Sequence, residues 1–180
     1  MKKKLMAITA VFCCAMTMTV FTACGDDDDK PYIDNKKPVA VSMNYAFETT
    51  SETLNVFDLT IEYYDANGTV QTEQMTNTQW QKSLRTKIPT TVGARLLIKL
   101  KDGVDVASME KVTVSYGYEY KGHPVSADNS VAGTVIGGSS GTNLTMKGDK
   151  VSEYLAKHSD GLVKYLYKYA SDGNAESGSW

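Results

Sequence analysis

The chain has 180 residues, of which 42% are hydrophobic, and its 19 basic and 21 acidic side chains give a formal net charge of −2. This near-neutral balance argues against a nucleic-acid-binding protein, because such proteins meet phosphates with a strongly basic surface. The length is sufficient for an ordinary hydrophobic core.

The first 23 residues have the pattern of a secretion signal. Lys2 to Lys4 precede an apolar run that extends from Leu5 to Phe21. A basic start, an apolar stretch and small residues before a cleavage site are typical of an export signal. The run is short for a membrane span, which needs about 20 residues. We therefore assign residues 1–23 to a signal peptide and leave them out of the fold.

A lipid attachment site follows this signal. The motif "FTAC" at residues 21–24 resembles the lipobox of bacterial lipoproteins, although Phe21 replaces the leucine that is usual at its first position. The resemblance implies that cleavage leaves Cys24 as the first residue and that Cys24 carries the lipid, which anchors the protein in the outer membrane. The alternative is an ordinary signal peptide cleaved near Ala23, with Cys24 as a free thiol.

Four aspartates, Asp26, Asp27, Asp28 and Asp29, follow the cysteine in "CGDDDDK". This run resembles the surface-export signal of lipoproteins from Bacteroidetes-type bacteria, which implies an outer-membrane lipoprotein exposed at the cell surface. Two alternatives are the periplasmic face of the membrane and a simple solvated spacer, since blocks of like charge repel and stay disordered. We interpret residues 24–37 as a lipidated, acidic, flexible tether and residues 38–180 as a single domain.

Cysteine positions limit the chemistry of that domain. The other two cysteines, Cys13 and Cys14, lie inside the signal. No thiol remains in residues 38–180 for a disulfide or a cysteine-ligated metal. We expect no metal site and no cofactor.

The sequence of the first half of the domain predicts mainly strands. Apolar residues alternate over 38–49, which predicts a strand with one buried face. Over 54–64 the apolar positions change phase after Val56, which predicts a bulge or a strand that changes sheets. Asn67-Gly68 predicts a hairpin with a return strand over 69–75.

Further alternation predicts strands over 80–85, 94–100 and 112–120. The glycine- and serine-rich stretch from 125 to 148 predicts one short strand near 131–136 and then a loop.

The last third should contain the single helix. Asp149 is the expected N-cap, apolar residues recur at helical spacing from Val151 to His158, and Gly161 is the expected C′ residue. Alternating aromatic residues predict a final strand over 163–169. The tail after it should be loose, with Trp180 able to dock.

Together these elements predict a mainly β domain, an antiparallel two-sheet sandwich of immunoglobulin-like architecture with one short helix near the C-terminus. The stretch "YYDANGTVQTEQMTNTQW" resembles segments of small lipoproteins of the same bacterial group, and no chemistry is attached to that resemblance.

Catalytic patterns are missing from the sequence. No nucleophile motif stands near the two histidines; we interpret His123 as a turn residue and His158 as a half-buried helix residue. The stretch "GGSSG" lacks the ending of a phosphate-binding loop, and "SDGNAE" lacks the spacing of an EF-hand. We therefore expect no enzyme.

Aromatic residues are the remaining candidates for binding, since the chain has 11 tyrosines, mostly in predicted strands. Such rings stack on sugars or anchor protein partners. The candidates are Trp80, Tyr116, Tyr118 and Tyr120, together with the row Tyr165, Tyr167 and Tyr169. The alternative, which we favour, is that these rings simply build the core and its rim.

Three functions remain open. The first is a lipid-anchored envelope module that binds a glycan, an envelope surface protein or a host component. The second is a structural or assembly subunit of an outer-membrane surface complex. A hydrolase is the third.

Overall fold

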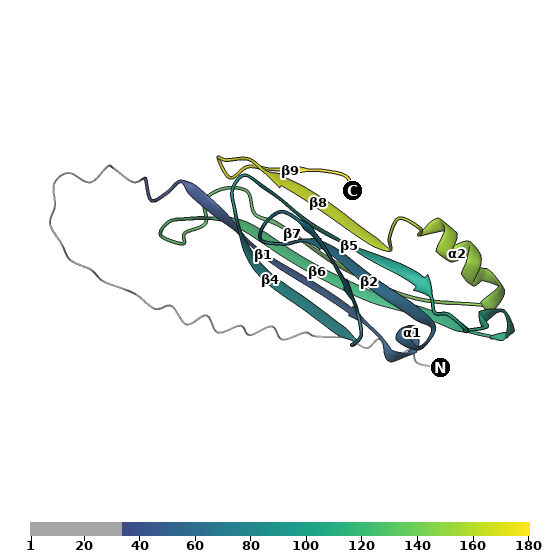
Figure 1. The fold of residues 1–180 in the computed structure, drawn as a ribbon. Coiled ribbons are helices and arrows are strands. Elements are labelled where there is room, and N and C mark those ends of the chain that lie inside the picture. Colours follow the sequence, from purple (N-terminus) through teal and green to yellow (C-terminus); the bar gives the residue numbers. More distant parts are fainter. Residues whose placement is uncertain (1–33) are drawn as a thin grey trace, which may run out of the picture. The chain divides into compact units, whose positions relative to one another are not determined.

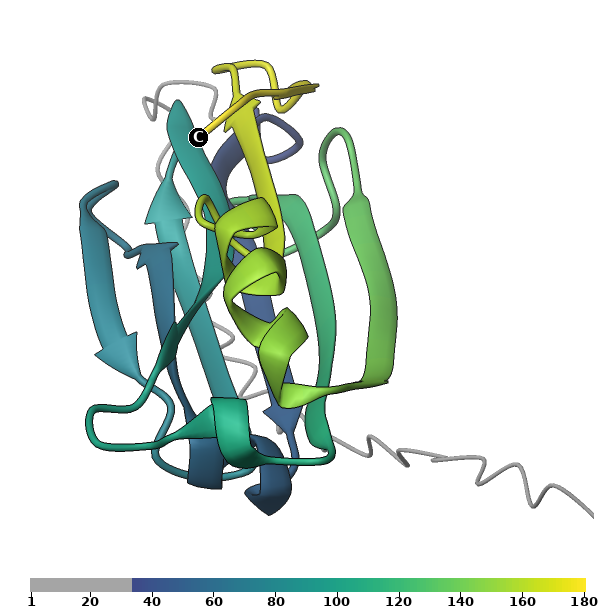
Figure 2. The same cartoon turned by 90° about the vertical axis from the view of Figure 1, so that its right-hand side faces the viewer.

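Residues 34–180 are described by the structure, a computed structural model, and their nine strands form two antiparallel sheets packed face to face (Figure 1, Figure 2). In spatial order the first sheet contains β4 (Gln79–Lys87), β1 (Pro38–Thr49), β6 (Val112–Ser126) and β7 (Ile136–Met146). The second contains β3 (Val70–Gln74), β2 (Phe57–Tyr64), β5 (Thr90–Leu100), β8 (Val163–Tyr169) and β9 (Ala175–Ser177). The prediction of an antiparallel sandwich with a short helix near the C-terminus is confirmed.

Short helices connect the sheets. They are α1 (Ser51–Val56), η1 (Val106–Ser108), η2 (Gly148–Lys150) and α2 (Val151–Lys157). In Figure 1, α1 and α2 lie at one end of the sandwich, and the described chain begins at the other. No helix in residues 34–180 is long and apolar enough to cross a membrane.

The core lies between the sheets because alternate residues of each strand point inward. Every second residue of β2, from Phe57 to Tyr63, is buried, and the inward residues of β1 pack against them. A second cluster fills the end near the helices, where Val151 of α2 packs with Phe57 and Val114. The alternation predicted for the central strands is therefore confirmed.

The predicted strand over 54–64 is wrong in its first part. Residues 51–56 form α1, which begins where the Thr50 side chain accepts a hydrogen bond from the Thr53 backbone N–H. This helix carries the chain from one sheet to the other, and β2 begins only at Phe57. The phase change in the sequence marks the end of a helix turn, not a bulge.

Both predictions for the glycine- and serine-rich region are also wrong: over 131–135 only Val131 forms an isolated bridge, to Val125, and no loop replaces the strand that follows. Residues 136–146 form β7, which pairs with β6 without a register break from Ile136 opposite Gly122 to Met146 opposite Val112. Most of its side chains are exposed, so no alternation of polar and apolar residues reveals it. Small residues fit here: a Cβ on Gly138 would lie 2.9 Å from the Tyr120 ring.

Both predicted ends of the C-terminal helix need correction. Asp149 lies inside η2, while Lys150 occupies the N-cap of α2 without a side-chain capping bond. The helix ends at its C-cap, His158. Gly161 lies beyond the C′ position, in the loop before β8, where a φ of +124° favours glycine.

The tail after β8 is ordered, which corrects the expectation of a loose end. Residues 175–177 form β9 and pair with β8. The predicted docking of Trp180 is confirmed: its indole N–H donates to the Tyr165 carbonyl oxygen at 3.0 Å, and the Arg95 guanidinium lies 5.0 Å from its ring centroid.

Candidate functional site

The candidate binding tyrosines of β6 face the opposite sheet. Tyr120 is 8% exposed, and its ring stacks on that of Tyr165 with centroids 3.9 Å apart. Tyr118 stacks on the same Tyr165 ring, and Tyr116 packs at the edge of both core clusters. The Tyr120 and Tyr167 hydroxyls are 2.8 Å apart. These rings form a stack between the sheets, whereas the binding interpretation required them together on an outer face.

Trp80, the fourth candidate, lies in β4 at the side of the sandwich. Its ring packs on Phe47 and Tyr63, with centroids 5.9 and 5.3 Å away. The half-buried ring therefore closes the core between the two edge strands.

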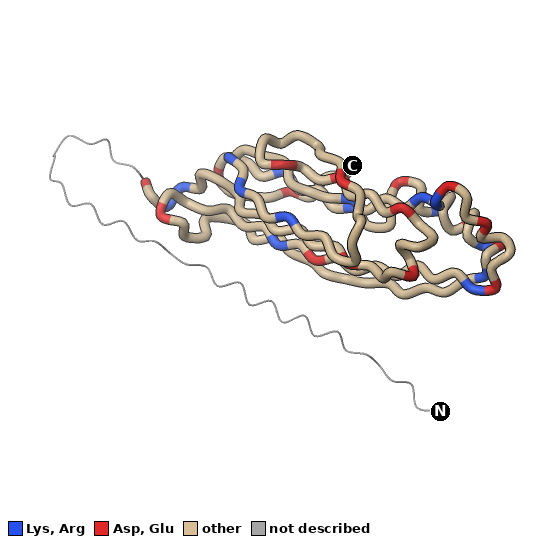
Figure 3. The backbone as a smooth tube through the Cα atoms, turned by 60° about the horizontal axis from the view of Figure 1, so that its bottom comes forward, with Lys and Arg blue, Asp and Glu red and all other residues tan. Residues whose placement is uncertain are grey.

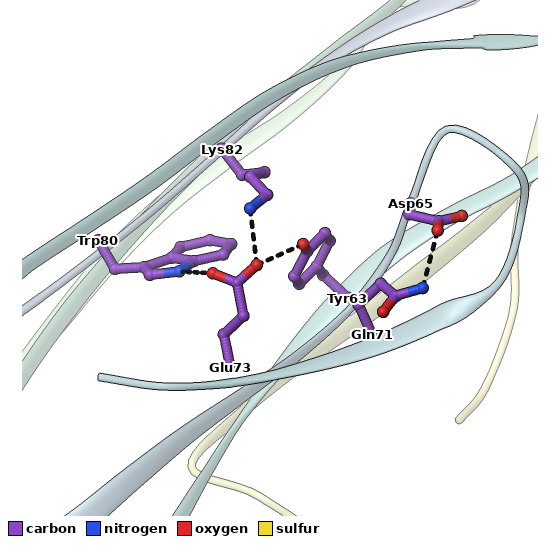
Figure 4. Close-up of polar contacts among 6 residues, drawn as sticks. All are labelled: Tyr63, Asp65, Gln71, Glu73, Trp80 and Lys82. Carbon is purple, nitrogen blue, oxygen red and sulfur yellow. Dashed lines mark hydrogen bonds and ion pairs between the residues drawn. The ribbon is translucent and has the colours of Figure 1, made fainter. Parts of the chain in front are cut away.

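An ionised carboxylate holds these two edges together (Figure 4). Glu73 of β3 accepts hydrogen bonds from the Tyr63 hydroxyl at 2.6 Å, from the Trp80 indole at 2.8 Å and from the Lys82 ammonium at 2.6 Å. Because Trp80 and Lys82 come from β4, the carboxylate bridges one sheet to the other. The Lys82 and Tyr63 hydrogen bonds lower the pKa of Glu73 to about 2.

The hairpin that joins β2 to β3 is fixed by a second carboxylate. Asp65 accepts hydrogen bonds from the backbone N–H groups of Asn67 and Thr69. It also accepts one from the Gln71 amide, which Figure 4 shows. Gly68 adopts a φ of +72° at the tip. The predicted Asn67-Gly68 hairpin is confirmed, with a loop of several residues whose shape is set by the Asp65 side chain.

This hairpin forms one wall of an open cleft of about 890 Å³. The hairpin residues 66–68 lie on one side, the turn from β4 to β5 on another, and the end of β8 on a third. The cleft is lined by Ala66, Asn67, Gly68, Arg85, Thr86, Lys87, Pro89, Thr90, Thr91, Lys168 and Tyr169. Lys87 pairs with Ala40, so the cleft lies at the end of the sandwich where the described chain begins.

Cationic and hydroxyl groups dominate the cleft. Arg85, Lys87 and Lys168 line it, and no acidic residue does. Within residues 34–180 none of these three cations takes part in an ion pair. Arg85 donates only to the Asn129 amide oxygen, at 2.9 Å. The cleft therefore presents positive charge that residues 34–180 leave without an acidic partner.

Elsewhere in the described chain, residues of both signs are mixed. In Figure 3, basic and acidic segments are interspersed along the tube. Local ion pairs account for several of them, such as Lys157 with Glu153 and Lys164 with Asp160. On a chain of net charge −2, an uncompensated basic cleft is a local feature that the whole-chain charge hides.

The two histidines lie apart from this cleft. His123 sits within β6, so its interpretation as a turn residue is wrong; burial and the nearby Lys121 lower its pKa. His158 is the C-cap of α2, where its ring Nδ1 lies 2.9 Å from the Tyr154 carbonyl oxygen. Neither residue has a carboxylate partner among its hydrogen bonds in residues 34–180.

Sequence reasoning missed the residues of the cleft. Arg85 and Lys87 belong to one strand and Lys168 to another, and only the packing of the sheets brings them together. The only local pattern that could have indicated the cleft is the spacing of Arg85 and Lys87, which lie two residues apart and therefore on the same, outer face of β4.

The lipid-attachment and export residues, Cys24 and Asp26 to Asp29, lie outside the described residues. Within 34–180, no three His, Cys, Asp or Glu residues are grouped so as to hold a metal ion. No protein family, curated protein sequence or solved structure matches this chain.

Proposed function

We propose that the protein is a lipid-anchored binding module of the cell envelope and that the cleft of Arg85, Lys87 and Lys168 binds an acidic glycan. The observation that carries this proposal is that three cations line one open cleft and none of them forms an ion pair within residues 34–180. Carboxylate or sulfate groups of a polysaccharide would supply the missing counter-charge. No catalytic step is part of the proposal.

The other groups in the cleft suit a sugar. Thr90 and Thr91 add hydroxyl-bearing side chains beside the cations, whereas the buried Tyr169 hydroxyl donates to the Thr134 carbonyl oxygen. Sugars carry many hydroxyls, which pair well with such groups and with the exposed backbone of the hairpin. Because the cleft is open rather than enclosed, it suits a segment of a long polymer better than a small molecule.

Binding to an acidic polymer tests the site. The full chain is titrated with polygalacturonate and with heparin, and with dextran as a neutral polymer. The triple variant Arg85→Gln, Lys87→Gln, Lys168→Gln should bind the acidic polymers at least about tenfold more weakly, because it removes three charge-assisted contacts.

A matched control removes the same charge elsewhere. The variant Lys111→Gln, Lys121→Gln, Lys147→Gln also loses three exposed cations, but none lines the cleft. It should bind like the original chain. Equal weakening by both triple variants, or equal binding of dextran, would contradict a specific site.

The anchor and the location rest on the lipobox and on the acidic run. Cys24→Ala should abolish lipid labelling and release the protein from membranes. Replacement of Asp26 to Asp29 by alanine should protect the domain from protease added to intact cells, while the original chain is cleaved. If the protease cleaves that variant as it cleaves the original chain, the aspartates are only a spacer and not an export signal.

An assembly subunit of a surface complex is the second candidate function, and strand β7 favours it. This long strand ends its sheet without a neighbour among the described residues. Such an edge is a template for another strand. A protein with this function would be recovered as an oligomer whether or not it bound the acidic polymers.

A further inference from the structure

Three of the four sheet edges in residues 34–180 are guarded against pairing with another chain. On β3 and β4 the inward-facing Glu73 and Lys82 meet at the side of the sandwich, and β4 also carries Arg85 and Lys87. The third of these edge strands, β9, has only three residues. Inward charges and short strands are the usual ways in which natural proteins prevent edge-to-edge association.

Strand β7 has none of these guards. Its eleven residues, "IGGSSGTNLTM", contain no charge and no proline, and its pairing with β6 has no bulge. Figure 2 shows β7 at the border of its sheet, with no described element beyond it. The outer backbone groups of a long, regular strand are thus available to another strand.

We infer that β7 pairs antiparallel with β7 of a second copy of this chain, with Gly141 opposite Gly141 at a two-fold axis. This inference names the partner for the second candidate function and does not depend on the glycan cleft. The resulting sheet is continuous across both copies, with the order β4-β1-β6-β7 followed by its mirror sequence β7-β6-β1-β4.

The sequence of β7 is self-complementary in this register. Ile136 lies opposite Met146, which pairs two apolar side chains, and Ser139 lies opposite Asn143, which pairs two polar ones. No charge opposes a like charge, because the strand has none. Directly opposed side chains are the main source of sheet stabilisation beyond the backbone.

The same register gives the exposed Leu144 a contact. Leu144 is 39% exposed although it faces inward, opposite the buried Val114. Across the axis it lies beside Gly138, whose missing side chain leaves room and whose position the Tyr120 ring covers. Leu144 of each copy thus packs against Gly138 and Tyr120 of the other, and the two-fold axis gives this contact twice.

Cysteine cross-linking tests this register in the full chain. Gly141→Cys places thiols face to face at the axis, and it should form a disulfide-linked dimer under mild oxidation. Gly137→Cys is the matched control: both glycines lie on the outer face, and an added Cβ meets a backbone oxygen at 3.3 Å in each case. Across the axis, the control thiols are about eight residues of strand apart, which is roughly 27 Å.

Peptide mass spectrometry must locate the bond between the peptides that contain position 141 of both copies, since the three native cysteines are present in both variants. Cross-linking of both variants to the same extent, or of neither, overturns the proposal.

A charge exchange tests the same interface without cysteine. Ser139→Lys with Asn143→Lys places lysines opposite lysines and should weaken the dimer roughly tenfold, since two like-charge pairs form across the axis. Ser139→Lys with Asn143→Glu places lysine opposite glutamate and should keep it. Sedimentation equilibrium in the absence of any glycan measures both. A monomeric original chain at about 100 μM, or equal masses for the two variants, overturns the proposal.

Discussion

Glu73 is a carboxylate held by three donors, so its ionisation is linked to the stability of the fold. Its pKa falls from an ordinary 4.5 to about 2 in the folded protein. A group with a depressed folded pKa stabilises the protein above its unfolded pKa, and this stabilisation is lost as the pH falls towards the folded value. The relevant window is therefore from about pH 5 down to about pH 2.

We predict that Glu73→Gln lowers the free energy of unfolding at pH 7 by about 1 kcal/mol, a value reduced for solvent screening because the side chain is 36% exposed. The difference from the original chain should shrink towards pH 2. Urea unfolding at several pH values measures it. Glu119→Gln, an exposed substitution outside any ion pair of the described residues, is the control and should show no pH-dependent difference from the original chain. If the free energy of unfolding of Glu73→Gln differs from that of the original chain by the same amount at every pH, the proposed link between Glu73 ionisation and stability is contradicted.

Two buried tyrosine hydroxyls should respond oppositely to removal. The Tyr45 hydroxyl accepts a hydrogen bond from the buried Gly93 N–H of the other sheet at 3.1 Å. The Tyr165 hydroxyl is buried without a hydrogen-bond partner in residues 34–180. Tyr45→Phe leaves the buried Gly93 N–H without an acceptor, whereas Tyr165→Phe removes a hydroxyl that has no hydrogen-bond partner in the described chain.

We predict that Tyr45→Phe destabilises the fold by about 1–3 kcal/mol and that Tyr165→Phe is neutral or stabilising by up to about 1 kcal/mol. Denaturant titration of both variants checks the signs. Equal destabilisation by the two substitutions would contradict the importance of the hydrogen bond between the Tyr45 hydroxyl and the Gly93 N–H.

At the scale of the element, α1 provides hydrogen-bond partners for backbone groups of β6 that no neighbouring strand pairs with. The Thr53 hydroxyl accepts from the Ser115 backbone N–H at 2.9 Å and donates to the Thr113 carbonyl oxygen at 3.3 Å. Strand β1 ends at Thr49, opposite Tyr116, so it no longer serves this part of β6. The Thr53 side chain thus satisfies two backbone groups of β6 beyond the end of the neighbouring strand, and the Thr49 hydroxyl satisfies a third, the Ser115 carbonyl oxygen.

Thr53→Val keeps the shape of the side chain but leaves both backbone groups without their partner, so we predict a loss of roughly 2–3 kcal/mol. Thr72→Val, on the exposed face of β3, should change stability little. Thermal unfolding of both variants compares them. A stable Thr53→Val protein would mean that the two groups find other partners.

Elements with one buried face were predictable, and those without one were not. Strands β1, β6 and β8 alternate in the sequence because burial imposes a period of two. Strand β7 has almost no buried side chains and therefore no period. Helix α1 is too short for a helical period, and its capping Thr50 gave too little signal beside a run of strand-forming residues.

At the scale of the molecule, the sequence predicted the sandwich but not the cleft. The sandwich follows from patterns within each segment. The cleft depends on how the β4–β5 turn and the end of β8 meet in space, which no segment encodes alone. The tyrosines are frequent enough to be recognised in the sequence, whereas the three cations belong to two distant segments of the chain and come together only in the folded protein.

If the cleft binds acidic polymers through charge, binding should weaken as salt rises. The cations are exposed, and the Debye length shortens from about 10 Å at 0.1 M salt to about 3 Å at 1 M. We predict a steady fall in affinity over this range, with the triple cleft variant showing a shallower slope. Isothermal titration of heparin at several salt concentrations measures it; a salt-independent affinity would exclude these cations as the main contacts.

The position of the cleft beside the start of β1 also has a mechanical consequence. Ala40 pairs with Lys87 on one side and with Val125 on the other, so the first residues of β1 adjoin the strand that bears two cleft cations. A tensile load between residue 38 and a ligand held at Lys87 would open these antiparallel pairs one at a time, as in unzipping. A load applied instead between residue 38 and the start of β4 at Gln79, which pairs with Glu48 at the far end of β1, would strain the β1–β4 pairs together, in shear. The domain would therefore yield more readily to force at its cleft than at its opposite end.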